Sequence, residues 1–310
     1  MSIFDRAAPG ARPAVAGGIA LAATLPALVM TFGSSPVAAH GIVGDRFFPA
    51  TITTDDPAVA DELSLPTVDT FQTADDPPAR QVDISGEYSK RLTSRLGISI
   101  DGAWTEVDAP GAPRASGFQN LGTTLKYQGI ANAPHELMVT VGLGVDWGRT
   151  GDERVGASPT TALTPTLYFG KGAGDLPESL GWAKPFAVTG VIGYSVPLSA
   201  DEPRTLNTGF AFEYSMRYLS SHVRDLGLPR VVNQLTPLVE VSLSTPTANG
   251  AGPTTGTVNP GVIWSGQHMQ IGAEAIIPIN AASGHNVGVV VQVHWFLDDL
   301  FPRSIGRPIW

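Results

Sequence analysis

Apolar and polar residues alternate with a period of two along most of the chain beyond residue 80. Between Leu137 and Trp147 every odd position is apolar, whereas the even positions are mostly small or polar. Because successive side chains of a strand point to opposite faces, this pattern predicts a β-strand with one apolar face. Three further segments show the same clear alternation: 209–218, 268–277 and 287–297.

Seven more segments show a weaker alternation: 82–90, 96–105, 118–128, 161–170, 186–195, 235–244 and 257–264. Strands of this length with one apolar face are typical of transmembrane β-barrels, in which a closed sheet satisfies every backbone group in lipid. Bacterial single-chain barrels have an even number of strands. Either 65–73 or 219–233 supplies a twelfth strand, or one of the weaker segments is not a strand. The pattern predicts an all-β fold, an antiparallel transmembrane β-barrel of about 12 strands.

A soluble β-sandwich is the main structural alternative. Its strands would average only about five or six residues, and its polar faces would carry many Lys and Glu side chains. Here the polar faces carry Gly, Ser, Thr, Ala and isolated carboxylates, which favours a crowded barrel lumen. Aromatic residues also lie near the strand ends, as the aromatic girdles of membrane barrels require. These residues are Trp104, Tyr127, Trp147, Tyr168, Phe169, Phe186, Tyr194, Tyr218, Trp264 and Trp295.

Composition narrows the class further. The 310 residues include no cysteine, only 15% are charged, and the formal net charge is −9. The absence of cysteine argues against a disulfide-stapled domain, and the acidic balance argues against nucleic acid as a partner. Beyond residue 33 no apolar run approaches the roughly 20 residues that a membrane-spanning helix needs.

The first 39 residues resemble an export signal. Two arginines precede an uncharged stretch from Ala14 to Phe32, and Val37-Ala38-Ala39 offers the small residues that a signal peptidase reads. A membrane anchor is the alternative, but Pro26 and the cleavage-like end favour a signal peptide cut after Ala39. We therefore expect a bacterial outer-membrane protein with membrane lipid and the outer-membrane assembly machinery as partners. The pattern does not define an oligomeric state.

Residues 40–80 differ from the rest of the chain, because they carry eight carboxylates, two arginines and five prolines. Proline removes backbone donors and interrupts regular structure, so this segment is predicted to be an irregular acidic arm with one short ordered piece at 44–48. If the short turns 91–94, 131–134 and 265–267 face the periplasm, the longer segments 148–160 and 245–256 face outward and the strand at 82–90 runs inward from the outer side. The arm then has to reach the extracellular end as a strand or by threading the lumen, so it is a candidate plug. The expected domains are 1–39 signal peptide, 40–80 arm, 81–297 barrel and 298–310 C-terminal tail.

Four segments carry a family resemblance: Lys90–Thr93, Trp147–Gly151, Phe169–Pro177 and Lys184–Ala187. Together they resemble bacterial outer-membrane transporter-like proteins related to the barrel family named for the meta-pathway of phenol degradation. The resemblance covers roughly residues 82–297, consists mostly of turn and strand-end residues, and implies passage of small, often apolar molecules. Outer-membrane barrels usually end on a strand whose last residue is aromatic. Here the last clear strand stops near Leu297, and a proline-containing tail follows to Trp310.

The parity of each strand assigns charged residues to the lumen, where carboxylates outnumber bases and should favour cations. The candidate lumen-lining residues are Glu87, Asp101, Lys126, Glu136, Asp146, Glu213, Arg217, Glu240, Glu274 and His294. A barrel of this size can be filled with side chains or open, and glycines on the inward face favour a narrow passage. The inward glycines are Gly142, Gly144, Gly209, Gly272 and Gly288.

The expected function is a channel or transporter for small apolar or cationic solutes. The alternative is a closed structural or surface-binding barrel whose long outer loops bind a ligand or partner. An enzyme is not expected, because His268, His285 and His294 accompany no G-x-S-x-G elbow or zinc-ligand spacing. No cofactor, metal or catalytic residue is predicted.

Overall fold

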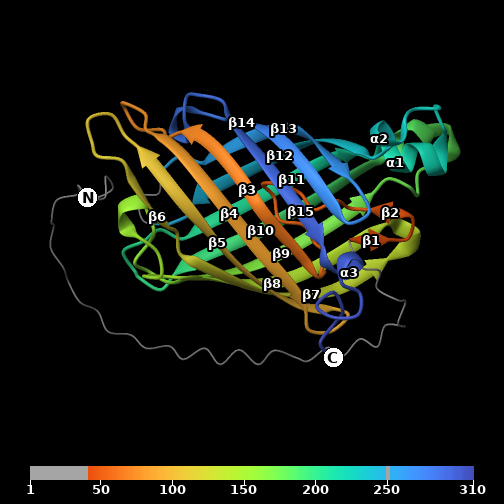
Figure 1. Ribbon diagram of the computed structural model, residues 1–310, viewed down its shortest axis with the longest axis horizontal. Helices are drawn as coiled ribbons and strands as arrows, with labels where there is room; N and C mark the ends of the chain where they lie inside the picture. The colour runs from red at the N-terminus through yellow and green to blue at the C-terminus, as the bar shows by residue number, and fades with distance from the viewer. Residues whose placement is uncertain (1–40, 249–251) are drawn as a thin grey trace. The chain divides into compact units, whose positions relative to one another are not determined.

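The computed structural model describes residues 41–248 and 252–310, so the predicted signal peptide lies outside the described residues. Its wall is a single antiparallel sheet that closes on itself (Figure 1). The wall strands are β3 (Glu62–Gln72), β4 (Arg80–Arg91), β5 (Leu96–Asp108), β7 (Leu121–Asn132), β8 (Leu137–Trp147), β9 (Ala162–Gly172), β10 (Phe186–Pro197), β11 (Thr205–Tyr214), β12 (Leu235–Pro246), β13 (Thr255–Ser265), β14 (Met269–Pro278) and β15 (Gly288–Phe296). A short strand, β6 (Ala115–Phe118), extends the sheet beside β5.

The twelfth wall strand is β3, which pairs with β15 on one side and with β4 on the other and so closes the barrel. The barrel therefore begins at Glu62 and not at residue 81, and the predicted arm contains a strand. Pairing with β4 shifts register between Ser64 and Thr67. The shift changes whether the even-numbered or the odd-numbered residues of β3 face the lumen. The alternation of apolar and polar residues that marks the other strands is therefore interrupted within β3. The alternative source, 219–233, forms short helices.

Alternation of the strands is confirmed by the exposure of their side chains. In β8 the side chains of Val141, Leu143 and Trp147 are exposed on the outside, whereas Met138 and Thr140 are buried inside. Large apolar side chains on the outside and polar ones inside are the reverse of a soluble protein and match a lipid-embedded barrel. This is the architecture of bacterial outer-membrane proteins. In the described part of the chain, no helix is long and apolar enough to cross a membrane.

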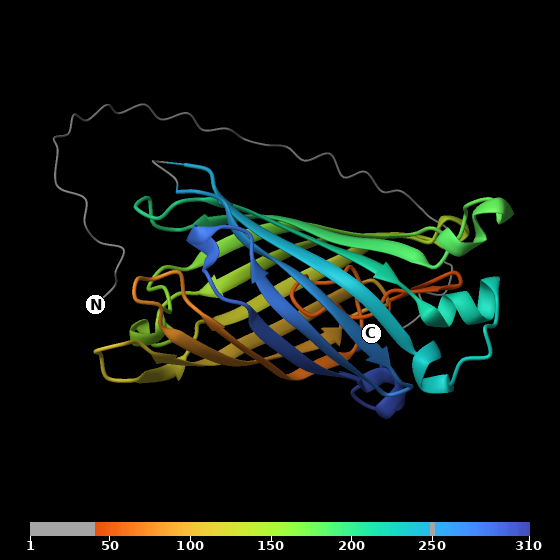
Figure 2. The same ribbon diagram turned by 90° about the horizontal axis from the view of Figure 1, so that it is seen from above.

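The barrel has two distinct ends (Figures 1 and 2). We call the end at which β3 begins and β15 finishes the terminal end, and the opposite one the far end. The predicted short turns 91–94, 131–134 and 265–267 all lie at the terminal end, and the long segment 148–160 lies at the far end, as expected. Two longer segments, 173–185 and 215–234, also lie at the terminal end.

The connections contain only short helices. At the terminal end these are η1 (Ala133–His135), η3 (Glu178–Ala183), α1 (Met216–Tyr218), η4 (Leu219–Val223), α2 (Arg230–Asn233) and α3 (Leu297–Leu300). At the far end they are η2 (Glu153–Val155) and η5 (Ala281–Ser283).

Strand β11 ends at Tyr214, earlier than the predicted residue 218. The Ser215 hydroxyl accepts a hydrogen bond from the Tyr218 backbone N–H and caps α1, so the chain turns helical where the apolar alternation continues. Arg217 is consequently exposed on a helix outside the barrel wall, and its assignment to the lumen was wrong. Tyr168 and Tyr218 are buried, so they do not belong to the aromatic girdle to which the pattern assigned them.

Candidate functional site

Residues 41–61, which we call the arm, enter the lumen from the terminal end and return to it before β3 begins (Figure 2). The arm opens with a small hairpin of β1 (Ile42–Val43) and β2 (Arg46–Phe47), which confirms the short ordered piece expected near 44–48. The Arg46 guanidinium is fully buried and pairs through Nε with Glu136 Oε2 at 3.0 Å. It also donates to the Pro185 carbonyl at 3.0 Å and lies 3.9 Å from the centre of the Tyr218 ring.

The arm reaches furthest into the lumen around residues 52–54, which bind Glu240 of β12. The Glu240 carboxylate accepts hydrogen bonds from the backbone N–H groups of Ile52 at 2.7 Å, Thr53 at 3.0 Å and Thr54 at 2.5 Å. The Thr53 hydroxyl donates a fourth bond at 2.8 Å. Because each of these donors satisfies a fully buried carboxylate, the tip of the arm is held in one position.

The returning half of the arm binds the opposite side of the wall. Asp55 pairs with Lys126 of β7 at 2.6 Å, and the Pro57 carbonyl accepts a hydrogen bond from Thr140 of β8 at 2.6 Å. At the terminal end the buried carboxylate of Asp61 accepts bonds from the backbone N–H and the Nε of Arg91, both at 2.8 Å. The arm is thus fastened at its start, its tip and its end.

Glycines of the wall make room for the arm. A Cβ atom at Gly272 would lie 2.5 Å from Ile52 Cδ1, and one at Gly209 would lie 2.8 Å from Thr54 Cγ2. At Gly97 and Gly170 the added atom would meet Val59 and Phe48, at 2.9 and 3.2 Å. With the arm seated, its side chains occupy the space that Gly209 and Gly272 were expected to leave as a passage.

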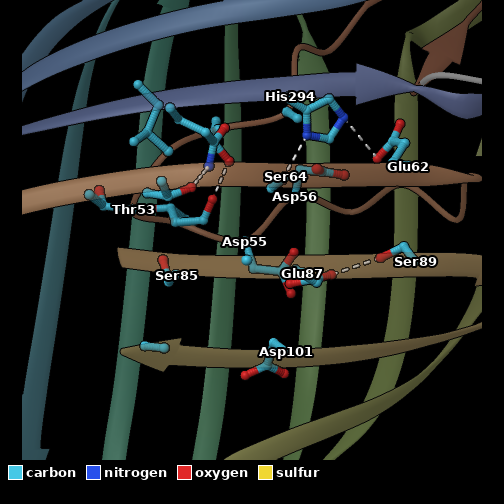
Figure 3. A pocket seen from close by; sticks show the side chains of 18 of the residues that line it. Thr53, Asp55, Asp56, Glu62, Ser64, Ser85, Glu87, Ser89, Asp101 and His294 are labelled. Atoms are coloured by element: carbon cyan, nitrogen blue, oxygen red, sulfur yellow. Dashed lines mark hydrogen bonds and ion pairs between the residues drawn. The ribbon is translucent and has the colours of Figure 1, made fainter. Parts of the chain in front are cut away.

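A cavity of about 450 Å³ remains between the arm and the wall strands β3, β4, β5, β7, β8 and β15 (Figure 3). Its charged lining consists of six carboxylates and two bases: Asp55, Asp56, Glu62, Glu87, Asp101, Asp146, Lys126 and His294. The lining extends to Gln119 and Asn120 in the connection at the far end. Two smaller cavities, of about 280 and 240 Å³, also have Thr53 in their lining, so the arm tip forms the floor of the space facing the far end.

Burial changes the acidity of one arm carboxyl in this cavity. Asp56 accepts a hydrogen bond from the Ala58 backbone N–H at 2.7 Å. Its burial, with the nearby carboxylate of Glu62, raises its pKa from 3.8 to about 7, although Lys126 acts in the opposite direction. The arm therefore carries a group that changes charge near neutral pH.

His294 joins two residues of β3 in the same cavity (Figure 3). Its Nδ1 lies 2.8 Å from Ser64 Oγ, and its Nε2 lies 3.4 Å from Glu62 Oε2. The linked hydroxyl, imidazole and carboxylate of these three residues are the same groups that a Ser–His–acid catalytic triad uses. A buried imidazole placed between a hydroxyl and a carboxylate also links β15 to β3, which is where the barrel closes. His268 and His285 lie in connections between strands, with exposed side chains.

The ten residues assigned to the lumen have different positions. Five of them line the cavity: Glu87, Asp101, Lys126, Asp146 and His294. Four are buried around the arm or inside the wall: Glu136, Glu213, Glu240 and Glu274. Arg217 is the exception. Arg46, Asp55, Asp56, Asp61, Glu62 and Ser64 were missed as site residues, because the arm was treated as irregular. The repeated Asp-Asp-Pro and the acidic bias of residues 40–80 were the available signal.

No protein-family model and no curated protein matches the chain. Among solved structures, the KdgM porin is similar over 74% of this chain and 98% of its own, with 11% identity and a TM-score of 0.43. The beta domain of the Bordetella autotransporter BrkA is similar over 77% and 99%, with 10% identity and a TM-score of 0.43. The translocator domain of NalP from Neisseria meningitidis is similar over 76% and 86%, with 8% identity and a TM-score of 0.41. Similarity at this level does not bear on function, and the barrel assignment stands on this chain's own strand pairing.

Proposed function

We propose that the mature chain, beginning at His40 after signal cleavage, is an outer-membrane channel for small cationic solutes, and that the arm is its plug. The observation that supports this proposal is the cavity, where six carboxylates face two bases. Carboxylates around a narrow path raise the local concentration of cations and repel anions. Passage through a pore needs no catalytic group, so the chain is proposed not to be an enzyme.

The orientation follows from the connections. Short turns of membrane barrels face the periplasm. Three of the five connections at the terminal end are the short turns between β4 and β5, β7 and β8, and β13 and β14, so we place this end inside and the far end outside, with 173–185 and 215–234 as longer periplasmic segments. In this orientation the cavity faces the exterior, and the arm separates it from the periplasm. The resemblance to the barrels of the phenol meta-pathway implies passage of small, often apolar molecules. The acidic lining favours a cation over an uncharged aromatic compound.

The test is planar-bilayer recording of the refolded mature chain under a salt gradient, with the arm locked or free. Thr54 and Gly209 suit a disulfide lock, since a Cβ atom at Gly209 would lie close to both branches of the Thr54 side chain and the natural chain has no cysteine. We expect the oxidised double variant Thr54→Cys/Gly209→Cys to be closed, and its reduced form to conduct in discrete steps with a cation-selective reversal potential. The single variant Thr54→Cys is the matched control and should not respond to oxidation.

Charge selectivity needs its own variant. Asp101→Asn/Asp146→Asn removes two charges from the cavity and should shift the reversal potential toward zero, whereas Asp76→Asn, in the turn between β3 and β4, should not. If the arm stays seated in both the oxidised and the reduced protein, the channel is tested with a variant that lacks residues 41–58. If that variant inserts stably and still does not conduct, the channel proposal is wrong and a closed barrel with binding loops replaces it.

A further inference from the structure

Two segments at the terminal end expose large apolar side chains. One is η3, which carries Leu180 and Trp182, and the other is the excursion 215–234, which carries Leu226 and Val231. Trp182 is 53% exposed and Val231 is 62% exposed. Gly181 of η3 lies opposite Val223 of the excursion, so the two segments are neighbours. We call them together the platform, and Figures 1 and 2 show its helices projecting beyond the strands.

The platform carries more arginines than carboxylates. Its acidic side chains are Asp225 of the excursion and Glu178 of η3, and Glu178 pairs with Lys184 next to η3. Arg217, Arg224 and Arg230 are all exposed, and within the described residues none of their guanidinium groups lies in an ion pair with a carboxylate. Asp225 is the acidic residue of the excursion, and it accepts a hydrogen bond from the Gly227 backbone N–H at 2.8 Å. Three exposed arginines beside exposed apolar side chains suit an anionic apolar interface.

The platform continues the aromatic end of the barrel wall. Phe186 at the start of β10 and Tyr214 at the end of β11 meet edge to face, with ring centres 4.7 Å apart. The Tyr214 hydroxyl donates to the Trp182 carbonyl at 3.3 Å. Aromatic residues at the ends of wall strands lie at the level of lipid headgroups. Trp182 is therefore tied to the level of the membrane surface and does not stand far above it.

The other side of the excursion is occupied by the arm. Tyr218 packs on the Arg46 guanidinium, and His222 lies 3.9 Å from Asp45. Burial, with the adjacent Glu136 carboxylate, raises the pKa of Tyr218 to about 12, so its hydroxyl stays neutral there. Because this side meets the arm, the exposed arginines and Trp182 are left for a partner outside the lumen.

We infer that the platform binds the phosphate groups of anionic phospholipids in the leaflet at the terminal end. The arginines supply bidentate donors for phosphate, and Trp182, Leu180 and Val231 enter the boundary between headgroups and acyl chains. The inference depends on the barrel being embedded in a membrane, as proposed above, but not on its conducting ions. Lipid is favoured over a protein partner because the platform is continuous with the aromatic end of the wall.

The test measures which lipids lie next to Trp182. The protein is refolded into phosphatidylcholine vesicles with a small fraction of brominated lipid, either phosphatidylglycerol or phosphatidylcholine. The emission of Trp182 is the difference between the natural chain, which has 6 tryptophans, and Trp182→Phe. One arginine near an anionic surface strengthens attraction about fivefold. We therefore expect brominated phosphatidylglycerol to quench this emission several times more than brominated phosphatidylcholine at the same fraction.

In the variant Arg217→Gln/Arg224→Gln/Arg230→Gln, the two brominated lipids should quench the Trp182 emission equally. Its matched control, Arg114→Gln/Arg149→Gln/Arg154→Gln, removes three arginines from far-end connections and should keep the preference. Equal quenching of the natural chain by the two lipids would overturn the inference. Quenching by aqueous iodide without quenching by either brominated lipid would also overturn it, and would indicate a protein partner. Bilayer conductance plays no part in this assay, so its result is separate from that of the channel test.

Discussion

Arg46 and Glu136 form a buried ion pair that joins the hairpin of the arm to the turn between β7 and β8. The Nε and Oε2 atoms lie 3.0 Å apart, and the two side chains are only 1% and 5% exposed. The same carboxylate accepts a hydrogen bond from the Gly174 backbone N–H at 2.9 Å. One carboxylate therefore connects the arm with two connections at the terminal end, and the arm is built into the barrel.

The variant Arg46→Met should loosen the arm strongly. It leaves Glu136 buried without its cation, and breaking a buried pair in this way costs about 3–5 kcal/mol. We expect cleavage of the arm by proteinase K to become more than tenfold faster in the refolded protein. Arg154→Met is the control, since Arg154 pairs with Asp152 at the surface and such pairs contribute little. Equal cleavage rates in all three proteins would show that the pair does not seat the arm.

The contact between Gly272 and Ile52 allows a test by exchange of size. Gly272→Ala places a methyl group against the Ile52 side chain and should weaken seating of the arm, because overpacking of a tight contact costs about 1–3 kcal/mol. Adding Ile52→Ala should restore most of the loss, which a double-mutant cycle on the proteolysis rate would measure as favourable coupling. Gly102→Ala is the control, because a Cβ atom there meets nothing within 4 Å. Additive effects would place Ile52 elsewhere.

Much of the wall could be predicted from alternation alone. Strand β8 has the predicted bounds, because its large outward side chains are apolar and exposed while Met138 and Thr140 are buried against the arm. Strand β3 was harder to detect because its register shift reverses inward parity between Ser64 and Thr67. The end of β11 was misplaced because Met216 and Tyr218 continue an apolar alternation inside a capped helix.

The seat of the arm could not be predicted, because it depends on pairs far apart in sequence. Three of the four segments on which the expected family resemblance rested hold the arm. Lys90 and Arg91 bind Asp61, Gly170 faces Phe48, and the Lys184 and Pro185 carbonyls accept from Arg46. These three segments consist of turn and strand-end residues because they lie at the terminal end, where the arm enters the lumen. Sequence spacing contains no information about which strand would meet residues 46, 48 or 61.

Asp61 should matter for the whole barrel and not only for the arm. Besides Arg91, its carboxylate binds Lys90 Nζ at 2.5 Å, and both cations also hold carbonyls of the C-terminal tail at Gly306 and Arg307. Asp61→Asn leaves two cations underpaired, so the free energy of unfolding should fall by about 3 kcal/mol. Denaturant unfolding measured by tryptophan emission would show it. Asp76→Asn, an exposed carboxylate in the turn after β3, is the control and should leave the midpoint unchanged.

Seating of the arm should depend on pH through Asp56. The pKa of this carboxyl is raised from 3.8 to about 7, mainly by burial and then by Glu62, with Asp55 adding to the rise and Lys126 opposing it. A raised pKa means that the seated arm binds the proton more tightly than the released arm does. Its contribution is therefore complete below about pH 4 and is lost as the pH rises through about 7. Proteinase K cleavage of the arm, corrected for the protease's own pH response, should accelerate between these limits.

Asp56→Asn tests the assignment, because an amide cannot ionise and keeps an oxygen for the Ala58 N–H. We expect this variant to cleave slowly at every pH, at the rate of the natural chain at pH 4. Asp45→Asn is the matched control, since Asp45 lies in the same arm with a largely exposed side chain, and it should keep the pH response. If Asp56→Asn keeps the full response, another group titrates and Asp56 does not control seating. If the natural chain shows no pH response, the prediction is wrong. The charge of Lys126 then stabilises the ionised Asp56 carboxylate enough to offset its burial.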